Sequence, residues 1–369
     1  MKISNSMLYS QVNADISRNS EILFKLNGQI SSGKRINAPS DDPLGLSSVL
    51  GYRTELNSFT QYGKSIDYST GWLNRMESIL QDTDDLLGRA SELAVQQASS
   101  TSSAETRKGA AEEVKQLREE ILSNANAKYG NKYIFSGTRT QTQPYLDVDV
   151  DKWQADVATM ATTAPASLVD GARYISTAAG ATQNHIFQYS TATSSWGDQG
   201  APAEGDAVMV SDKNTMYVFN KGEWKSIYQG NDSTFSVQIG KGSTAQTNIP
   251  GSEVFTNQQG NVYMTLLRLE KALRDNNPDG IRAELPNIDS SDTVISNNLA
   301  KVGAIVNKLD HTKTVIDRST VDTKASISNI EDLDYAEAIT SLQNQQTIYQ
   351  ATLKSASMIT GLSLVDYIK

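Results

Sequence analysis

The chain has 369 residues, a formal net charge of −9 and no cysteine. Its length predicts roughly two or three domains. Its hydrophobic content of 38% and aromatic content of 7% are low for a single compact body of this size. The missing cysteines exclude disulfides, thiolate nucleophiles and sulfur-ligated metals. The acidic balance argues against binding to a nucleic-acid backbone, which requires clustered Lys and Arg.

The chain carries no pattern typical of a membrane span or a cleaved leader. It has no run of about 18 apolar residues, the length that a helix needs to cross a bilayer. The first residues, MKISNSMLYSQVNADIS, lack the apolar segment of a secretory signal peptide. We therefore expect a protein that stays in the cytosol or leaves the cell by a route that these signals do not record.

The two ends of the chain carry matching thin apolar stripes. Residues 1–36 have a helical pattern whose apolar positions are Val12, Ile16, Leu23, Leu26 and Ile30. Near the other end the helical stripe consists of Tyr335, Ile339, Leu342, Gln346, Tyr349, Leu353, Ala356 and Thr360. Because this stripe mixes polar residues and alanine with few large apolar ones, the helix cannot be stable alone. The sequence predicts that the last residues pair with the first in a coiled coil.

A long helical rod is predicted between these ends. Asp42 followed by Pro43 is a favourable helix start, since the carboxylate can cap a helix whose first position suits proline. The predicted seam is Phe59, Tyr62, Ile66, Ser69, Leu73, Met76, Leu80, Thr83, Leu87, Ala90 and Ala94, and a second, antiparallel helix faces it with Ala110, Val114, Leu117 and Ile121. Helix is expected again over residues 262–274 and from Asp279, with an irregularity at Pro286 and a pattern that continues through Leu333 into the C-terminal stretch.

The middle of the chain has a different pattern. Residues 147–250 contain short alternating runs such as DAVMVSD and TMYVFNKGEWKSIYQ, separated by Gly, Asn, Asp and Ser, which is typical of antiparallel hairpins. Gly222 is expected to supply a positive φ at one hairpin tip. The sequence thus predicts a terminal coiled-coil domain (residues 1–42 and 325–369), a helical rod domain (43–140 and 261–324) and an inserted β-rich domain (141–260).

No motif predicts catalysis, a cofactor or a metal. Residues 28–34 fit the G-x-x-x-x-G-K pattern of a phosphate loop, but a helix precedes them and Arg35 stands where a Ser or Thr is needed. Asp147, Asp149 and Asp151 would share one face of a strand, yet the Gly and Glu of a calcium loop are missing after them. With only two histidines available as general bases, we predict that the chain is not an enzyme.

Residues near both ends resemble the bacterial flagellins. The segment LNGQISSGKRIN at residues 26–37, with SDDPLGL at 40–46, is similar to the N-terminal signature of that family. The opening MKISNSMLYSQ, the segment YIFSGT at residues 133–138 and the ending GLSLVDYI at 361–368 are more similar to the hook-associated members that join hook and filament. The resemblance covers about the first 145 and last 100 residues and leaves out the insert.

The resemblance implies an α+β multidomain fold with paired terminal helices, a helical rod and an antiparallel β-rich insert. It implies a structural role at the hook–filament junction of the extracellular flagellum, reached through the flagellar type III export apparatus. The implied partners are the first hook-associated protein, flagellin, a cytosolic export chaperone and identical copies in a ring of about eleven. The assembly residues would be Val12, Ile16, Leu23, Leu26, Ile30, Leu342, Tyr349 and Leu353, and the chaperone would bind Leu342, Tyr349, Leu353, Leu362 and Leu364.

A second, local resemblance concerns residues 88–96, GRASELAVQ, which are similar to the flagellin stretch that Toll-like receptor 5 reads. It places Arg89, Leu93 and Glu113 on the key positions, although these positions also serve packing. Two other interpretations of the chain remain open at this point. It could be a filament flagellin, or a β-rich enzyme or carbohydrate-binding domain carried on a helical stalk.

Overall fold

The computed structural model describes residues 5–99, 101–166 and 169–367, with side chains described for residues 7–358 within these ranges. The chain forms two compact units, Met1–Gly63 with Lys313–Lys369 and Lys64–Thr312. Two long helices, α2 (Pro43–Gln97) and α6 (Pro278–Glu331), contribute residues to both units. Among the described helices none has a stretch that is both long and apolar enough to pass through a bilayer.

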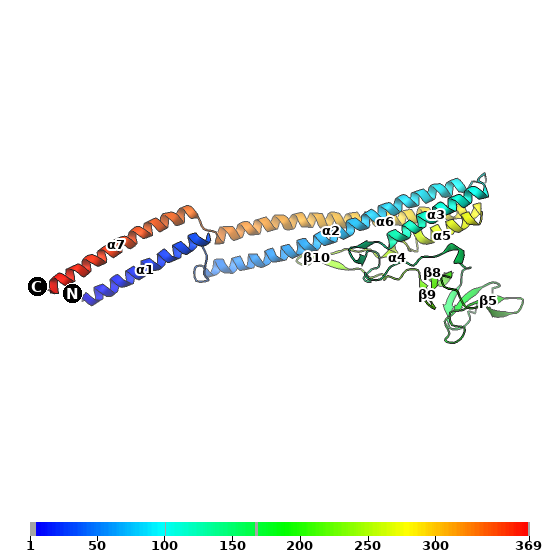
Figure 1. Ribbon diagram of the computed structural model, residues 1–369, viewed down its shortest axis with the longest axis horizontal. Coiled ribbons are helices and arrows are strands. Elements are labelled where there is room, and N and C mark those ends of the chain that lie inside the picture. Colours follow the sequence, from blue (N-terminus) through cyan, green and yellow to red (C-terminus); the bar gives the residue numbers. More distant parts are fainter. Residues whose placement is uncertain (1–4, 100, 167–168, 368–369) are drawn as a thin grey trace. The chain divides into compact units, whose positions relative to one another are not determined.

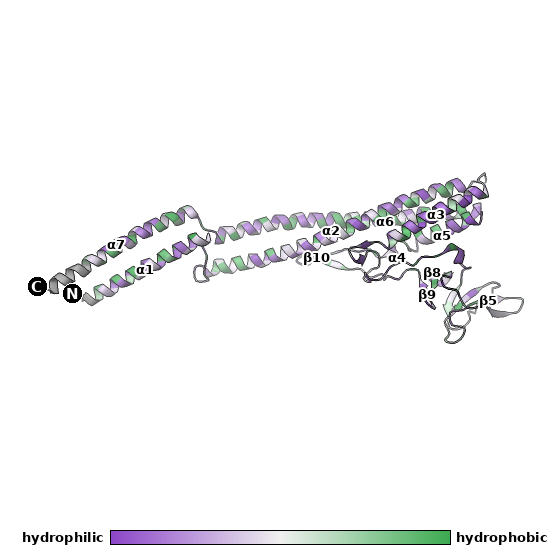
Figure 2. Cartoon of the chain, viewed as in Figure 1, coloured by the Kyte–Doolittle hydropathy of each residue, from purple (hydrophilic) through white to green (hydrophobic). Residues whose placement is uncertain are grey.

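In the first unit, helices from the two ends of the chain lie side by side. α1 (Asn5–Ser32) runs antiparallel to α7 (Tyr335–Tyr367), as Figure 1 shows. Hydrophilic and hydrophobic positions alternate along both ribbons in Figure 2. The predicted pairing of the termini is confirmed.

Two predicted helix boundaries are wrong. α1 ends at Ser32 rather than near residue 36, because Gly33 takes a left-handed conformation with φ +70°. The helical pattern also does not continue through Leu333, since α6 ends at Glu331 and α7 begins at Tyr335. The side chain of Asp334 accepts a hydrogen bond from the backbone N–H of Ala336 at 2.9 Å and so caps a new helix.

The helical part of the second unit follows the predicted seam. The predicted positions from Ile66 to Ala94 on α2 are all buried, as are those on α3 (Ala104–Ala125). α3 returns antiparallel along α2, and it begins where the hydroxyl of Ser103 accepts from the backbone N–H of Thr106 at 3.1 Å. α5 (Val262–Arg274) packs against α3, and α6 continues through Pro286, so the irregularity expected there does not end the helix.

The β-rich part contains four small sheets among the residues that the structure describes. They are the hairpins β1–β2 (Lys128–Tyr129, Lys132–Tyr133) and β10–β11 (Ser236–Gly240, Ser243–Gln246), the sheet β3–β4–β5–β6 (Thr159–Ala161, Arg173–Ser176, Ile186–Ser190, Ser195–Asp198) and the sheet β7–β8–β9 (Ala207–Val210, Thr215–Asn220, Glu223–Ser226). Short helices lie between them: η1 (Val150–Lys152), η2 (Ser211–Lys213) and α4 (Gly251–Val254). The predicted tip between β8 and β9 is confirmed, with φ of +54° at Lys221 and +82° at Gly222.

One pairing departs from the predicted antiparallel pattern. β3 pairs with β4 in parallel, with Met160 opposite Ile175. The eleven-residue connection between them, residues 162–172, is too long for a tight turn and returns the chain to the same end of the sheet. A cluster of Val157, Ile175, Ile186, Val208, Val210 and Trp224 forms the core between this sheet and β7–β8–β9.

A buried ion pair fixes the start of the β-rich part to the helices. Arg118 on α3 donates from Nε to Glu270 on α5 at 3.0 Å and from Nη1 to Asp147 at 3.1 Å. Burial raises the pKa of Tyr263 well above its ordinary value, so its hydroxyl stays protonated and donates to Asp147 at 3.1 Å. Arg274 pairs with Glu270 at 3.0 Å. These contacts hold α3, α5 and the chain after Tyr145 in one arrangement.

We predict that Glu270→Gln lowers the free energy of unfolding by about 3 kcal/mol, because it leaves the buried guanidinium of Arg118 without its most buried partner. Urea unfolding of the full chain measures this loss. The matched control is Glu119→Gln on the exposed pair with Lys115, which should cost less than about 0.5 kcal/mol. Equal losses in both variants would contradict a structural role for the ion pair.

Candidate assembly interface

The face of α7 that packs against α1 differs from the predicted face. At every second position of the predicted stripe, the residue that packs against α1 is the one just before the predicted residue. The positions of α7 that are buried or half-buried at alternating three- and four-residue steps are Ala338, Leu342, Gln345, Tyr349, Thr352 and Ala356. The prediction placed Tyr335, Ile339, Gln346 and Leu353 in the seam, and the structure exposes all four. On α1 the predicted residues Val12, Ile16, Leu23, Leu26 and Ile30 are all half-buried.

Polar side chains at the middle of the seam explain the shift. The amide of Asn19 donates to Oγ1 of Thr352 at 3.1 Å, and Gln345 donates to Oδ1 of Asn19 at 3.1 Å. A stripe with few large apolar side chains specifies the rotation of a helix only weakly. Hydrogen bonds across the seam therefore decide which face of α7 turns inward, as buried polar residues do in coiled coils.

The pairing leaves large apolar side chains exposed. On α7 these are Ile339, Ile348, Leu353 and Met358, with Leu353 exposed by 42% and Ile348 by 50%. On α1 they are Met7, Leu8, Ile22 and Phe24, and Phe24 is exposed by 78%. Leu362 and Leu364 lie within α7, but their side chains fall outside the described residues. We call these exposed side chains the outer apolar residues of the helix pair.

The signature segment after α1 forms the joint between the terminal helices and the rod. The backbone N–H of Arg35 donates to the carbonyl of Glu331 at 2.7 Å, and Leu333 donates to the carbonyl of Gly33 at 3.1 Å. The ammonium of Lys34 lies 2.6 Å from Oδ1 of Asp332. Lys34 and Asp332 thus form an isolated antiparallel bridge, which joins the break after α1 to the break between α6 and α7.

Arginine side chains brace the joint. Arg53 donates from Nη2 to both carboxylate oxygens of Glu331, at 2.7 and 2.9 Å. Arg35 donates to the carbonyl of Ile330 at 2.8 Å and to Asp42 at 3.1 Å. Asp42 in turn accepts from the backbone N–H of Gly45 at 2.9 Å, which confirms its predicted role at the start of α2.

Two glycines of the signature lie close to the ends of other side chains. Gly33 has a positive φ, and a Cβ on it would lie 2.9 Å from the hydroxyl of Tyr335. A Cβ on Gly45 would lie 2.4 Å from the capping carboxylate of Asp42. Sequence reasoning took the acidic pair as a cap but missed Arg53, Glu331 and Asp332. A sequence signal for these residues exists. Charged residues stand near the two helix breaks, and opposite charges there could have been paired across them.

The other candidate residues lie in the second unit. Arg89 on α2 is within 2.7 Å of Glu113 on α3, while Leu93 is only 4% exposed. The structure therefore brings Arg89 and Glu113 together, and receptor recognition at this stretch stays a prediction. Gly28 lies inside α1, so residues 28–35 form no phosphate loop, and the described residues contain no group of three or more acidic or histidine side chains placed to hold a metal ion.

The joint should respond to acid through Asp332. Hydrogen bonds from Lys34 and Ser328 hold the pKa of Asp332 below its ordinary value of 3.8. A carboxyl group whose pKa is lowered in the folded state stabilises the fold at every pH above its ordinary pKa. This contribution is lost as the pH falls through the lower folded-state pKa. We predict that Lys34→Met raises the pKa of Asp332, measured by carboxyl NMR titration. Asp170 is the control, because its low pKa depends on hydrogen bonds from Thr191 and should not change.

Comparison with known families matches both helical regions of the chain. The family model of the bacterial flagellin N-terminal helical region matches residues 3–140, and that of the bacterial flagellin C-terminal helical region matches residues 285–368. These ranges contain the helix pair, the joint and most of the rod.

Individual relatives include hook-associated proteins and flagellins. The chain is 30% identical over 146 residues to flagellar hook-associated protein 3 of Salmonella typhimurium, which is 39% of this chain and 46% of that protein. It is 20% identical over 372 residues to a flagellin of Clostridium tyrobutyricum, covering 95% of this chain and 96% of that one. The matches to the hook-associated proteins of Salmonella typhimurium and Escherichia coli span about half of each relative's length, 46% and 47%.

Solved structures share the fold. Flagellar hook-associated protein 3 from Legionella pneumophila superposes with a TM-score of 0.51 at 13% identity, over 76% of this chain and 98% of that one. FlgL from Xanthomonas campestris gives 0.50 at 14% identity, over 75% of this chain and 99% of that one. Since the terminal helix pair, its signature joint and the helical rod all match, the chain belongs to the bacterial flagellin family.

Proposed function

We propose that this chain is a structural adaptor of the bacterial flagellum that joins the hook to the filament. The observation that carries the proposal is the helix pair, whose outer apolar residues remain exposed on both α1 and α7. Exposed apolar groups of this size favour contact with other proteins. The hook-associated relatives and the similar ending of the chain indicate which position in the flagellum such contacts serve.

In this proposal the terminal helices polymerise by packing their exposed side chains against neighbours. On α7, Ile348 and Leu353 flank opposite sides of the seam, so one helix pair can contact a neighbour on each side. A closed ring of about eleven identical copies would use such head-to-tail contacts. The first hook-associated protein would lie on one side of this ring and flagellin on the other.

The thin seam also suits export through the flagellar type III apparatus. A helix pair with little apolar surface is marginal in water, so the ends can pass unfolded through a channel and become ordered when neighbours bury their exposed side chains. A cytosolic chaperone would cover α7 before export, with Leu342, Tyr349 and Leu353 as contacts. After export, this chain would be located at the extracellular junction between hook and filament.

A filament flagellin is the second candidate, because the match to the Clostridium tyrobutyricum flagellin spans nearly the whole of both chains. The two candidates differ in self-assembly. We predict that the purified chain stays monomeric at concentrations where flagellin polymerises, and that it binds to hooks carrying the first hook-associated protein. Sedimentation and negative-stain electron microscopy measure both properties. Long filaments formed by the chain alone would show that it is a filament subunit.

The exposed apolar residues can be tested separately from the fold. We predict that Ile348→Ser with Leu353→Ser lowers incorporation at the hook end by about tenfold or more, because it removes apolar contact between neighbours. Helix content and thermal unfolding of the dilute chain should stay unchanged, since both side chains are already exposed. Incorporation is measured by quantitative immunolabelling of hooks, with Lys354→Ser as the matched control. Full incorporation of the double variant would rule out this surface.

A further inference from the structure

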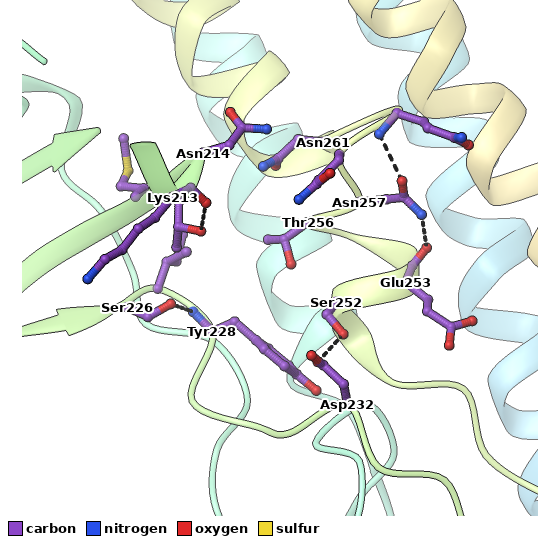
Figure 3. A pocket seen from close by; sticks show the side chains of 15 residues that line it. Lys213, Asn214, Ser226, Tyr228, Asp232, Ser252, Glu253, Thr256, Asn257 and Asn261 are labelled. Atoms are coloured by element: carbon purple, nitrogen blue, oxygen red, sulfur yellow. Dashed lines mark hydrogen bonds between the residues drawn. The ribbon is translucent and has the colours of Figure 1, made fainter. Parts of the chain in front are cut away.

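A cavity of about 650 Å³ lies in the second unit, outside the terminal helices and the joint. Its walls are the η2–β8 turn and the end of β9 on one side, and α4 with the following loop on the other (Figure 3). The volume lies within the range of roughly 300–1,000 Å³ that is typical of small-molecule sites. Neither the flagellar assembly proposed above nor the ion pair of Arg118 uses this cavity.

Carboxamide side chains are the distinctive feature of the lining. Asn214, Gln258 and Gln259 make no side-chain hydrogen bond with any part of the chain that the structure describes. Each carboxamide carries two N–H donors and a carbonyl acceptor, so together these three present donors and acceptors to a ligand. They line the cavity with the hydroxyl side chains of Thr215, Ser226 and Thr256.

The loop that carries two of these amides is held in place. Asn257 accepts from the backbone N–H of Gln259 at 2.8 Å and donates to the carbonyl of Glu253 at 3.1 Å. A Cβ on Gly260 would lie 2.5 Å from the carbonyl oxygen of Ser290, so the backbone fits closely against α6 there. Asn261 caps α5 by accepting from Met264 at 3.0 Å. A loop that is already ordered loses little conformational entropy when a ligand binds.

Tyr228 supplies an aromatic side chain on the same wall. Its ring extends toward Asp232 and Ser252 in Figure 3, and its hydroxyl donates to the carbonyls of Phe135 and Asn231, at 3.0 Å each. Burial raises the pKa of Tyr228 to about 12, so the hydroxyl remains a donor at neutral pH and keeps the ring in position. An aromatic ring beside carboxamides can contact both the C–H groups and the hydroxyls of a sugar ring.

The charges in the lining disfavour an anionic ligand. The carboxylates are those of Asp232, which accepts from the hydroxyl of Ser252 at 2.5 Å, and Glu253, which pairs with Lys301 at 2.9 Å. The ammonium of Lys213 lies over the ring of Tyr217, 5.4 Å from its centroid. Both carboxylates thus have partners, the ammonium of Lys213 lies over an aromatic ring, and the amide and hydroxyl side chains of the lining are uncharged.

A second cavity of about 140 Å³ adjoins the first. Both cavities are lined by Asn214, Gln258, Gln259 and Asn261, so the amides stand between them. A ligand longer than a single ring would contact these amides from both sides.

We propose that this cavity binds a short neutral saccharide, recognised by the amides of Asn214, Gln258 and Gln259 and by the ring of Tyr228. The full chain is titrated with cellotriose, maltotriose and chitotriose, and with sialyllactose as the anionic probe, using calorimetry and saturation-transfer NMR. We expect at least one neutral trisaccharide to bind and sialyllactose to bind at least about tenfold more weakly.

Two variants locate the binding. Asn214→Gly removes one amide at a position where φ is +45°, which glycine adopts without strain, and Gln258→Ala with Gln259→Ala removes two exposed amides that make no side-chain hydrogen bond within the described chain. Each variant should lower the affinity for the neutral trisaccharide by about tenfold or more, because hydrogen bonds to the ligand are lost. Gln199→Ala, an exposed amide elsewhere in the β-rich part, should bind as the unaltered chain does.

The proposal is overturned if none of the three neutral trisaccharides binds, if sialyllactose binds equally well, or if both amide variants retain full affinity. Thermal unfolding of each variant is measured alongside, and the glutamine variant decides the outcome should Asn214→Gly prove unstable. Incorporation at the hook end should be unaffected by the glutamine variant, which separates this cavity from the assembly function.

Discussion

The structure depends on the antiparallel pairing of α1 with α7 across a thin seam whose middle is polar. Asn19, Gln345 and Thr352 occupy its middle, and on α7 the large apolar side chains of the seam are those of Leu342 and Tyr349. Such a seam fixes the register of the two helices while burying little apolar area. The apolar residues outside the seam are then available to other molecules, which is the physical basis for assembly by this part of the chain.

The joint makes this pairing geometrically possible. The break after α1 lies beside the break between α6 and α7. Backbone hydrogen bonds between residues 33–35 and 331–333 give partners to N–H and C=O groups that the helix ends would otherwise leave unpaired. Arg53 and Arg35 place charge-assisted hydrogen bonds on the carbonyl and carboxylate oxygens at the end of α6. The signature of the family is therefore a structural element: its glycines allow the close approach, and its charged residues stabilise it.

The second unit is stabilised differently. Large side chains from α2, such as Trp72, Leu73 and Met76, are fully buried there. The ion pair of Arg118 with Glu270 joins α3 to α5, and the contact of Arg118 with Asp147 links these helices to the start of the β-rich part. The amide-lined cavity lies within this unit, and its lining shares no residue with the helix pair. A chain built this way can vary its outer part without altering the contacts that hold its ends together.

The sequence by itself determined most of the helical and strand segments, the buried seam of α2 and the cap at Asp42, because these depend on local periodicity and local hydrogen bonds. It also revealed the family through its signature residues. The tertiary structure alone decided the inward face of α7, the parallel pairing of β3 with β4, and the union of Lys34 and Arg53 with the end of α6. Each of these depends on contacts between residues far apart in the chain, and a one-residue rotation or a change of strand direction leaves the local pattern almost unchanged.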